Sequence, residues 1–248
     1  MLILLFLQWL GLIIFCYALF EIFSLILFGS IAKYLGYTTH PYRRERSGKT
    51  VIILGDSTVA GTGSERPEFS LAGRLGAEFP LISIRNYAKV GMGTRELAVF
   101  LRDHPDMKAD LVIIQIGGID TLTLRPLTHF SRRLDYIFAS AKKISAGRVV
   151  VSSSANLGTI PFFRFPLSCY FEERTRKIRA LFLEATESAE VSYVDLFEEK
   201  AADPFRQSPH LLFASDGIHP NGEGYGLWYT KLREVLSTER YDELLKHQ

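Results

Sequence analysis

The first 28 residues form an almost unbroken apolar run, and this run limits what the chain can be more than any other feature. Only Gln8, Gly11, Glu21 and Ser24 within it lie outside the hydrophobic set. A helix of about 20 apolar residues crosses the hydrocarbon layer of a bilayer, whereas a helix in a soluble core is rarely apolar on every side for so long. Residues 1–28 are therefore predicted to form a transmembrane anchor.

A cleaved signal peptide is the main alternative for this run. A signal peptide has a basic segment, an apolar core of about 7 to 15 residues and a small-residue cleavage site. The run here is longer, no basic residue precedes it and no A-x-A site follows, so we prefer an uncleaved anchor. Glu21 is discordant, because a carboxylate at mid-bilayer costs about 2.5 to 3.5 kcal/mol on insertion scales. Since residues 2–20 alone nearly span a bilayer, we expect Glu21 at headgroup level and residues 22–28 in the interface.

Charges after the run predict on which side of the membrane the rest of the chain lies. Residues 29–48 are expected to be a linker, with Pro41 and the basic cluster RRER. The basic residues that follow the span are Lys33, Arg43, Arg44, Arg46 and Lys49. Because such residues stay on the cytoplasmic side, the folded part is expected in the cytoplasm. The cluster suits anionic lipid head groups, but solvated tether charges explain it equally well.

Residues 49–248 have the composition of one folded domain. In the whole chain, 29 Lys and Arg against 27 Asp and Glu leave a formal charge of only +2. No nucleic-acid partner is expected, because that requires a concentrated basic face. Two cysteines are too few for a disulfide framework or a four-cysteine zinc site. Nothing in the sequence indicates the oligomeric state.

Short β-branched runs alternate with longer helical patterns along this domain. The expected strands are residues 50–55, 81–87, 110–117, 147–154 and 191–196, and the expected helices are 69–79, 94–104, 127–144, 170–189 and 221–247. Strands that are apolar throughout are buried on both faces. Their alternation with helices predicts an α/β fold with a five-stranded parallel sheet between two layers of helices. In such sheets, sites form at the carboxyl ends of the strands.

Polar motifs lie at these predicted strand ends. Gly55, Asp56 and Ser57 follow the first strand, and Asp216 to His219 (D-G-I-H) precede the last helix. Residues three apart on a helical turn share a face, so Asp216 could orient the His219 imidazole, which would take the Ser57 proton. We expect the serine hydroxyl to be exposed at the sheet edge. Taken singly, a serine after a strand is commonly a helix cap and a D-x-x-H pair a surface ion pair; the combination indicates nucleophilic catalysis.

In these motifs the chain resembles the SGNH/GDSL hydrolase superfamily, over about residues 50–235. G-D-S matches the first family motif, with Ser57 as the implied nucleophile. Gly91, in NYAKVGMGT, matches the second, and its N–H with that of Ser57 would form the oxyanion hole. D-G-I-H matches the last, with Asp216 orienting and His219 as general base. The resemblance implies a three-layer, flavodoxin-like sandwich and ester hydrolysis through an acyl-enzyme, with no cofactor. No metal is expected either, because the sequence contains no H-E-x-x-H or C-x-x-C motif.

One motif departs from the family's pattern. The third family motif is G-x-N-D, whereas the sequence here is G-G-I-D, with Ile119 in place of the asparagine. The asparagine amide would donate to the oxyanion, and loss of one such donor typically costs about 2.7 to 4 kcal/mol. A slow or substrate-restricted enzyme is therefore expected. Asn156, after the fourth strand, is either a replacement donor or simply a turn asparagine.

The aromatic segment TIPFFRFPLSCYF, residues 159–171, follows the fourth strand. Its two prolines make it a poor helix or central strand. Phe162 and Phe163 are candidate substrate contacts, in an acyl-chain pocket or in a lip resting on the bilayer, where aromatic rings are favoured. A loop packed on the core is the plainer alternative.

The sequence thus predicts a membrane-anchored serine esterase whose partners are the membrane and an ester substrate. An acyl lipid such as a lysophospholipid is the favoured substrate class, because anchoring raises the local concentration of lipids. Two alternatives stay open. One is deacetylation or acyl transfer on a cell-envelope sugar, which needs the domain outside the membrane. The other is a binding module that has lost activity, and the presence of Ile119 in place of the family's asparagine would be the trace of that loss.

Overall fold

The computed structural model describes residues 2–123, 125–145, 148–238, 241 and 244–245. Within these residues one parallel sheet contains the strands β1 (Thr50–Gly55), β2 (Ser83–Asn86), β3 (Leu111–Gln115), β4 (Val149–Ser152) and β5 (Ser192–Val194). Their order, β2-β1-β3-β4-β5, is the flavodoxin-like one. Each strand lies inside a predicted strand, so the predicted α/β fold with a five-stranded parallel sheet is confirmed.

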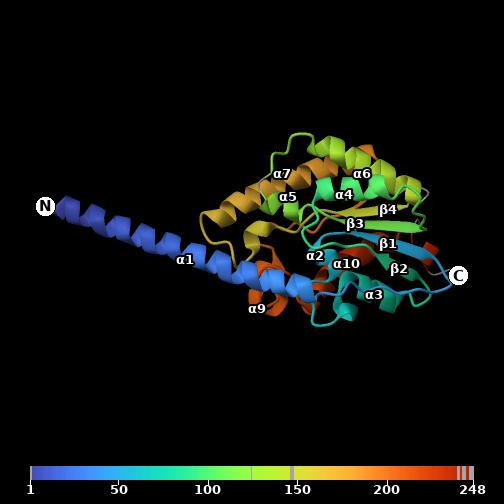
Figure 1. Cartoon of the computed structure of the whole chain (residues 1–248), viewed down its shortest axis with the longest axis horizontal. Helices are drawn as coiled ribbons and strands as arrows, with labels where there is room; N and C mark the ends of the chain where they lie inside the picture. The colour runs from blue at the N-terminus through green and yellow to red at the C-terminus, as the bar shows by residue number, and fades with distance from the viewer. Residues whose placement is uncertain (1, 124, 146–147, 239–240, 242–243, 246–248) are drawn as a thin grey trace.

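Helices cover both faces of the sheet (Figure 1). One layer contains α3 (Leu71–Glu78) and α10 (Gly222–Leu236), and the other contains α4 (Thr94–Asp103), α6 (Phe130–Ile144) and α7 (Leu167–Ser188). Successive strand side chains point to opposite faces, so β1 contributes to both cores. Val51 and Ile53 pack on the side of α3 and α10, while Ile52 and Leu54 pack on the side of α4, α6 and α7.

Several short helical turns join these elements, and the sequence patterns did not predict them. They are α2 (Ser57–Ala60), η1 (Pro67–Phe69), α5 (Gly118–Leu122), η2 (Leu157–Thr159), α8 (Pro204–Gln207) and α9 (Pro209–Leu212). Of these, α2 and α5 follow β1 and β3 directly, at the carboxyl edge of the sheet. They therefore lie where a site is expected in an open α/β fold.

Two long helices differ from their predicted spans. α7 begins at Leu167, so the end of the segment 159–171 is helical, contrary to the expectation. Pro166 stands just before its first turn, where no helical N–H is required from it. α10 ends at Leu236, although the prediction extended to residue 247. Much of that remainder, and residue 147 of the predicted fourth strand, lie outside the described residues.

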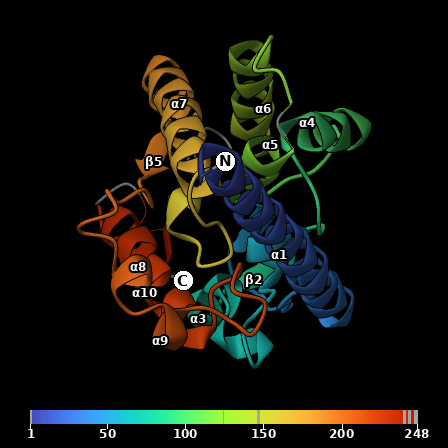
Figure 2. The ribbon, with the colours of Figure 1, turned by 90° about the vertical axis from the view of Figure 1, so that its left-hand side faces the viewer.

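α1 (Leu2–Thr38) is one continuous helix and extends ten residues past the predicted anchor boundary at 28. Every side chain from Leu2 to Phe20 is exposed. By length and composition this helix can cross a membrane, a test that a signal sequence passes equally. α1 projects from the domain at the end where α2 lies, and Figure 2 views the molecule from that end. The projecting part is thus on the side of the sheet's carboxyl edge.

From Glu21 onward, α1 packs against the domain through one stripe of its surface. The covered positions are Glu21, Ser24, Phe28, Ile31, Ala32, Leu35 and Gly36. Spacings of three and four residues place these positions on a single helical face. Gly36 allows a close approach, since a Cβ there would lie 3.0 Å from Val90 Cγ1.

The segment after α1 is bound to the domain. Arg44 pairs with Ile84 in an isolated antiparallel bridge beside the edge strand β2. Its guanidinium donates to backbone carbonyl oxygens of α3 and of the loop before β2. Arg43 donates to the carbonyl oxygen of Asn86 at 2.8 Å. These two arginines of the basic cluster therefore hold the chain on the edge of the sheet. The sequence analysis considered contacts with lipid head groups or solvated tether charges for this cluster, but not this role.

Candidate active site

The G-D-S motif forms the turn that presents Ser57 at the end of β1. Oδ1 of Asp56 accepts hydrogen bonds from the backbone N–H and the hydroxyl of Thr58, at 2.9 and 2.7 Å, and so caps α2. Gly55 is needed because a Cβ there would lie 2.1 Å from the carbonyl oxygen of Gln115 on β3. The turn is therefore fixed by its cap and by the close approach of the neighbouring strand.

Ser57, His219 and Asp216 are hydrogen-bonded in series. Nε2 of His219 lies 2.8 Å from the Ser57 hydroxyl, and Nδ1 of His219 lies 2.5 Å from Oδ2 of Asp216. The sequence prediction that these three residues converge agrees with this geometry. The expected exposure of Ser57 was wrong, because only 7% of this residue is accessible. Its side chain lies in the wall of a cavity instead.

The D-G-I-H segment is a turn before α10 and not the helical turn that the spacing argument assumed. Oδ1 of Asp216 accepts the backbone N–H groups of Ile218 and His219, at 2.9 and 3.0 Å. Gly217, between Asp216 and Ile218, has a φ of +61°, which glycine adopts at low cost. The N–H of Ala214 closes the turn on the carbonyl oxygen of His219 at 2.8 Å. Backbone hydrogen bonds to an aspartate, a common turn device, thus bring the two side chains together.

Electrostatics favour an ionised Asp216. Burial by itself would raise its pKa, but the hydrogen bonds from the His219 ring and from the backbone N–H groups outweigh burial and lower the pKa below its usual value. A carboxylate at Nδ1 favours the imidazole tautomer whose proton is on that nitrogen. Nε2 is then left as a proton acceptor facing the Ser57 hydroxyl. The arrangement can remove the serine proton as the oxygen attacks an electrophile.

An open cavity extends from Ser57 and His219. Most of the accessible surface of its wall is apolar. The apolar side chains in the wall include Leu122, Leu157, Ile160, Phe213 and Ile218. A wall of this kind favours contact with apolar groups. Among the residues that the structure describes, no group of three or more His, Cys, Asp or Glu side chains is placed to hold a metal ion.

The residues expected at the oxyanion hole lie in different surroundings. Ile119 lines the cavity, where the family pattern has asparagine. Gly91 is exposed in the loop between β2 and α4, has a φ of +79° and does not line the described cavity. Its role as a donor stays a prediction.

The aspartate that follows Ile119 in the G-G-I-D motif has a structural role that sequence reasoning missed. Asp120 accepts hydrogen bonds from the backbone N–H and the hydroxyl of Thr94, both at 2.8 Å, and so connects α5 to α4.

Asn156 lines the cavity, but other partners occupy its amide. Oδ1 accepts the N–H of Gly158 at 2.9 Å and caps η2. Nδ2 donates to the carbonyl oxygen of Glu198 at 3.0 Å and to Glu172 at 3.4 Å. These hydrogen bonds agree with the turn asparagine of the sequence analysis. A donor role toward an oxyanion stays a prediction without support from them.

Phe162 and Phe163 lie behind the cavity wall. They are 8% and 7% exposed and pack in one cluster with Leu157 and Ile160, which themselves line the cavity. The plainer alternative, a loop packed on the core, therefore describes them best, and direct substrate contact stays a prediction. Phe28 of α1 joins the same cluster. Sequence reasoning missed Phe28 because nothing local to α1 signals a contact with so distant a segment.

The fold and the hydrogen-bonded series define a class of α/β proteins, in which serine, histidine and aspartate meet at the carboxyl edge of a parallel sheet. The family model of the GDSL-like lipase/acylhydrolases matches residues 53–227, more than half of the chain. The chain belongs to this family. Membership implies a hydrolase that acts on esters.

Solved structures share the fold. A G-D-S-L family lipolytic protein from Veillonella parvula has 17% identity and a TM-score of 0.58 over 76% of this chain and 98% of its own. A lipase from a goat rumen metagenome has 18% identity and a TM-score of 0.61 over 77% and 99%. A lipase/acylhydrolase from Enterococcus faecalis has 18% identity and a TM-score of 0.56 over 76% and 95%. No curated protein matches the chain.

Proposed function

We propose that the protein is a membrane-anchored serine hydrolase that cleaves carboxylic esters through an acyl-enzyme. The observation that carries this proposal is the series of Ser57, His219 and Asp216 in the wall of a largely apolar cavity. The family to which the chain belongs supports ester chemistry. The retention of all three side chains counts against a binding module that has lost activity.

The proposed reaction has two halves. Ser57 Oγ attacks the ester carbonyl carbon while Nε2 of His219 takes the serine proton. The bond to the alcohol then breaks, His219 returns the proton to the leaving oxygen, and the acyl group stays on Ser57. In the second half, His219 deprotonates a water molecule that attacks this acyl-enzyme and releases the acid. Asp216 stays ionised and stabilises the imidazolium, and the N–H groups of Ser57 and Gly91 are the proposed donors to the oxyanion.

An acyl lipid, such as a lysophospholipid, is the substrate class that we propose. Apolar side chains in the cavity wall favour a hydrocarbon chain because its burial removes apolar surface from water. A sugar ester of the cell envelope, the alternative substrate, would place its hydroxyl groups against a lining whose accessible surface is mostly apolar, which is a less favourable fit. Attachment to a membrane would also raise the local concentration of lipid esters.

We further propose that α1 stays attached as a single-pass anchor. At 1.5 Å per residue, the exposed helix from Leu2 to Phe20 would span about 28 Å, close to the hydrocarbon thickness of roughly 30 Å. The stripe between Glu21 and Gly36 that packs on the domain would be lost with a cleaved signal peptide, which supports retention. The basic residues after the span favour a cytoplasmic domain. Protease protection in membrane vesicles tests this orientation, and digestion from the outer face would contradict it.

Covalent labelling tests the hydrolase proposal. An activated fluorophosphonate should label the full-length protein and should not label Ser57→Ala. Ser154→Ala is the matched control, because Ser154 lines the same cavity but is no part of the series, and it should label like the wild type. A wild-type protein that never labels and never hydrolyses a panel of short and long acyl esters would contradict catalysis.

A further inference from the structure

The loop of residues 160–166 is held on α1 by polar contacts at its tip. The hydroxyl of Tyr17 donates to the carbonyl oxygen of Phe165 at 2.7 Å. One turn along the helix, the Glu21 carboxylate pairs with the Arg164 guanidinium at 3.3 Å. The carboxylate that is discordant in an apolar helix therefore has its partner in this loop. Both contacts lie where the free part of α1 meets the domain.

The base of the same loop joins α1 to the catalytic cavity. The ring of Phe28 packs edge-on against Phe162, with centroids 5.7 Å apart. Phe28 thereby contacts the cluster that contains Leu157 and Ile160, and these two residues also form part of the cavity wall. Helix, loop and cavity wall are one packed unit, so a displacement of the loop from α1 would also disturb the wall.

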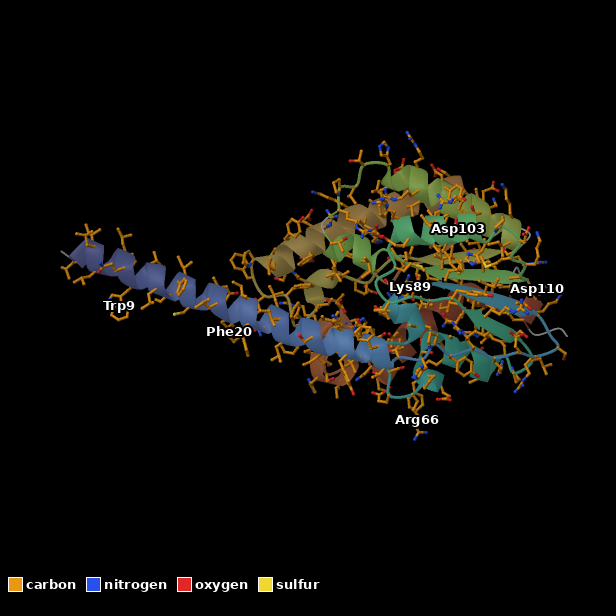
Figure 3. The ribbon with its side chains drawn as sticks, viewed as in Figure 1. Trp9, Phe20, Arg66, Lys89, Asp103 and Asp110 are labelled. Carbon is orange, nitrogen blue, oxygen red and sulfur yellow. The ribbon has the colours of Figure 1, made fainter. Side chains whose placement is uncertain are left out.

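The tip of the loop lies beside the part of α1 that would enter a bilayer. Tyr17 belongs to the exposed part of the helix, from Leu2 to Phe20. It lies about 6 Å from Glu21 along the helix axis, toward the N-terminus. Phe165 is bonded to it and is 75% exposed. Figure 2 shows the loop that precedes α7 lying beside α1, and Figure 3 shows Phe20 on the projecting part of α1 and Asp110 at the opposite end of the molecule. An exposed aromatic ring at this depth suits the membrane interface.

We propose that the loop of residues 160–166 is a membrane-inserting lip, which α1 holds in the headgroup layer so that the cavity behind it takes acyl chains directly from the bilayer. This inference rests on the proposed function for the anchor and for ester cleavage, and it adds how the substrate is selected. Esters that reside in a bilayer are cleaved in preference to soluble esters, because only they reach the cavity from the side of the lip.

Fluorescence quenching tests insertion without any need for activity. Phe165→Trp is made in a Trp9→Phe background, and the full-length protein is reconstituted in phosphatidylcholine vesicles with brominated acyl chains. The control is Leu81→Trp in the same background, since Leu81 is 55% exposed and precedes β2 at the opposite, amino edge of the sheet. Trp228 is buried and common to both. Emission from F165W should lie at shorter wavelength than emission from L81W, and the brominated chains should quench it. Emission from L81W should not be quenched. Absence of quenching in F165W, or equal quenching in both, overturns the proposal.

Substrate choice gives a second test. For each variant the hydrolysis rate of a long-chain ester in vesicles is divided by the rate for a short soluble ester. This ratio should fall about tenfold in Phe165→Ser, roughly what removal of one buried aromatic side chain from an apolar phase predicts, and should not change in Leu81→Ser. An unchanged ratio in F165S overturns the proposal.

The two proposals can fail separately. The quenching measurement is repeated in Ser57→Ala, where it should give the same result. If the wild type neither labels with fluorophosphonate nor turns over esters, the hydrolase proposal fails while the quenching still reports on the lip. If the wild type labels but the F165W fluorescence stays unquenched, the lip fails and the hydrolase stands.

Discussion

The carboxylate of Glu21 in α1 lies 3.3 Å from the guanidinium of Arg164, which follows it by 143 residues in the chain. The Glu21 side chain is only 12% exposed, whereas that of Arg164 is 39% exposed. A lone carboxylate in an apolar helix is costly near a bilayer, and a cation beside it reduces that cost. The guanidinium also lies over the ring of Phe20, 4.9 Å from its centroid. The pair therefore links the helix to the loop beside the cavity.

Charge reversal at Arg164 should release this loop. Arg164→Glu places two carboxylates together, so we expect backbone amides of residues 160–166 to exchange hydrogen about tenfold faster, as for a loss of about 1.4 kcal/mol. Hydrogen exchange followed by mass spectrometry, on the full-length protein in lipid nanodiscs, measures this. Glu21→Lys in the same chain should restore slow exchange. Arg102→Glu, at an exposed pair on α4, is the control and should leave the loop unchanged. Failure of the second substitution to rescue would show that the pair does not hold the loop.

Asp56 should make stability depend on pH in a direction opposite to that of Asp216. Burial raises the pKa of Asp56, although the two hydrogen bonds from Thr58 oppose the rise. The folded state thus binds this proton more tightly than the unfolded state, whose aspartate pKa is about 3.9. As pH rises through and above that value, wild type loses stability relative to Asp56→Asn, which keeps an acceptor for Thr58 but does not titrate. The lowered pKa of Asp216 acts in the opposite sense but cancels in this comparison.

Urea unfolding in detergent from pH 4 to pH 8 checks this expectation, with those limits set at about the ordinary aspartate pKa and well above it. The free energy of unfolding of D56N minus that of wild type should increase with pH. Asp103→Asn, at an exposed position on α4, should give a difference that does not change with pH. A D56N difference that is flat or that decreases would show that burial does not raise the pKa of Asp56.

The sheet and the meeting of Ser57 with His219 were predictable because their signals are local. Apolar β-branched runs mark strands that are buried on both faces, and the parallel order follows from the helices between them. Once the strands are parallel, their carboxyl ends share one edge. Residues that directly follow β1 and precede α10 can then meet there, even though they are far apart in the sequence.

The docking of α1 was not predictable in the same way. No local pattern around Glu21 or Phe28 indicates that Arg164 and Phe162 are their partners. These contacts depend on how α1 and the distant loop pack in three dimensions. The turn at Asp216 shows a second limit. A spacing of three residues fits a helical turn, but the backbone N–H groups of Ile218 and His219 bind the carboxylate in a non-helical turn. The result is the same side-chain contact through a different backbone.

Gly63 should be essential for the position of His219. Its φ is +92°, and a Cβ there would lie 2.9 Å from Cβ of His219 and 2.5 Å from the carbonyl oxygen of Pro220. Gly63→Ala should push the imidazole away from Ser57 and lower kcat about 100-fold, the cost of a displacement of about 1 Å. Gly217→Ala is the matched control, because its φ is also positive but its Cβ would meet nothing within 4 Å. It should cost about 1 kcal/mol of stability and change kcat far less. Equal kcat losses in both variants would point to backbone strain instead of the contact with His219.

Ile119 should be the residue that limits turnover. It lines the cavity with Ser57, at the position where the family pattern has an asparagine that donates to the oxyanion. Ile119→Asn should therefore raise kcat for a short soluble ester, by up to about 100-fold if the amide supplies a full donor. Stopped-flow acylation rates and the rate of fluorophosphonate labelling measure this gain. Ile119→Leu keeps the size without a donor and should not be faster than wild type. Turnover of I119N that is equal to or below that of wild type would mean that the missing amide does not limit this site, and that other donors already stabilise the oxyanion.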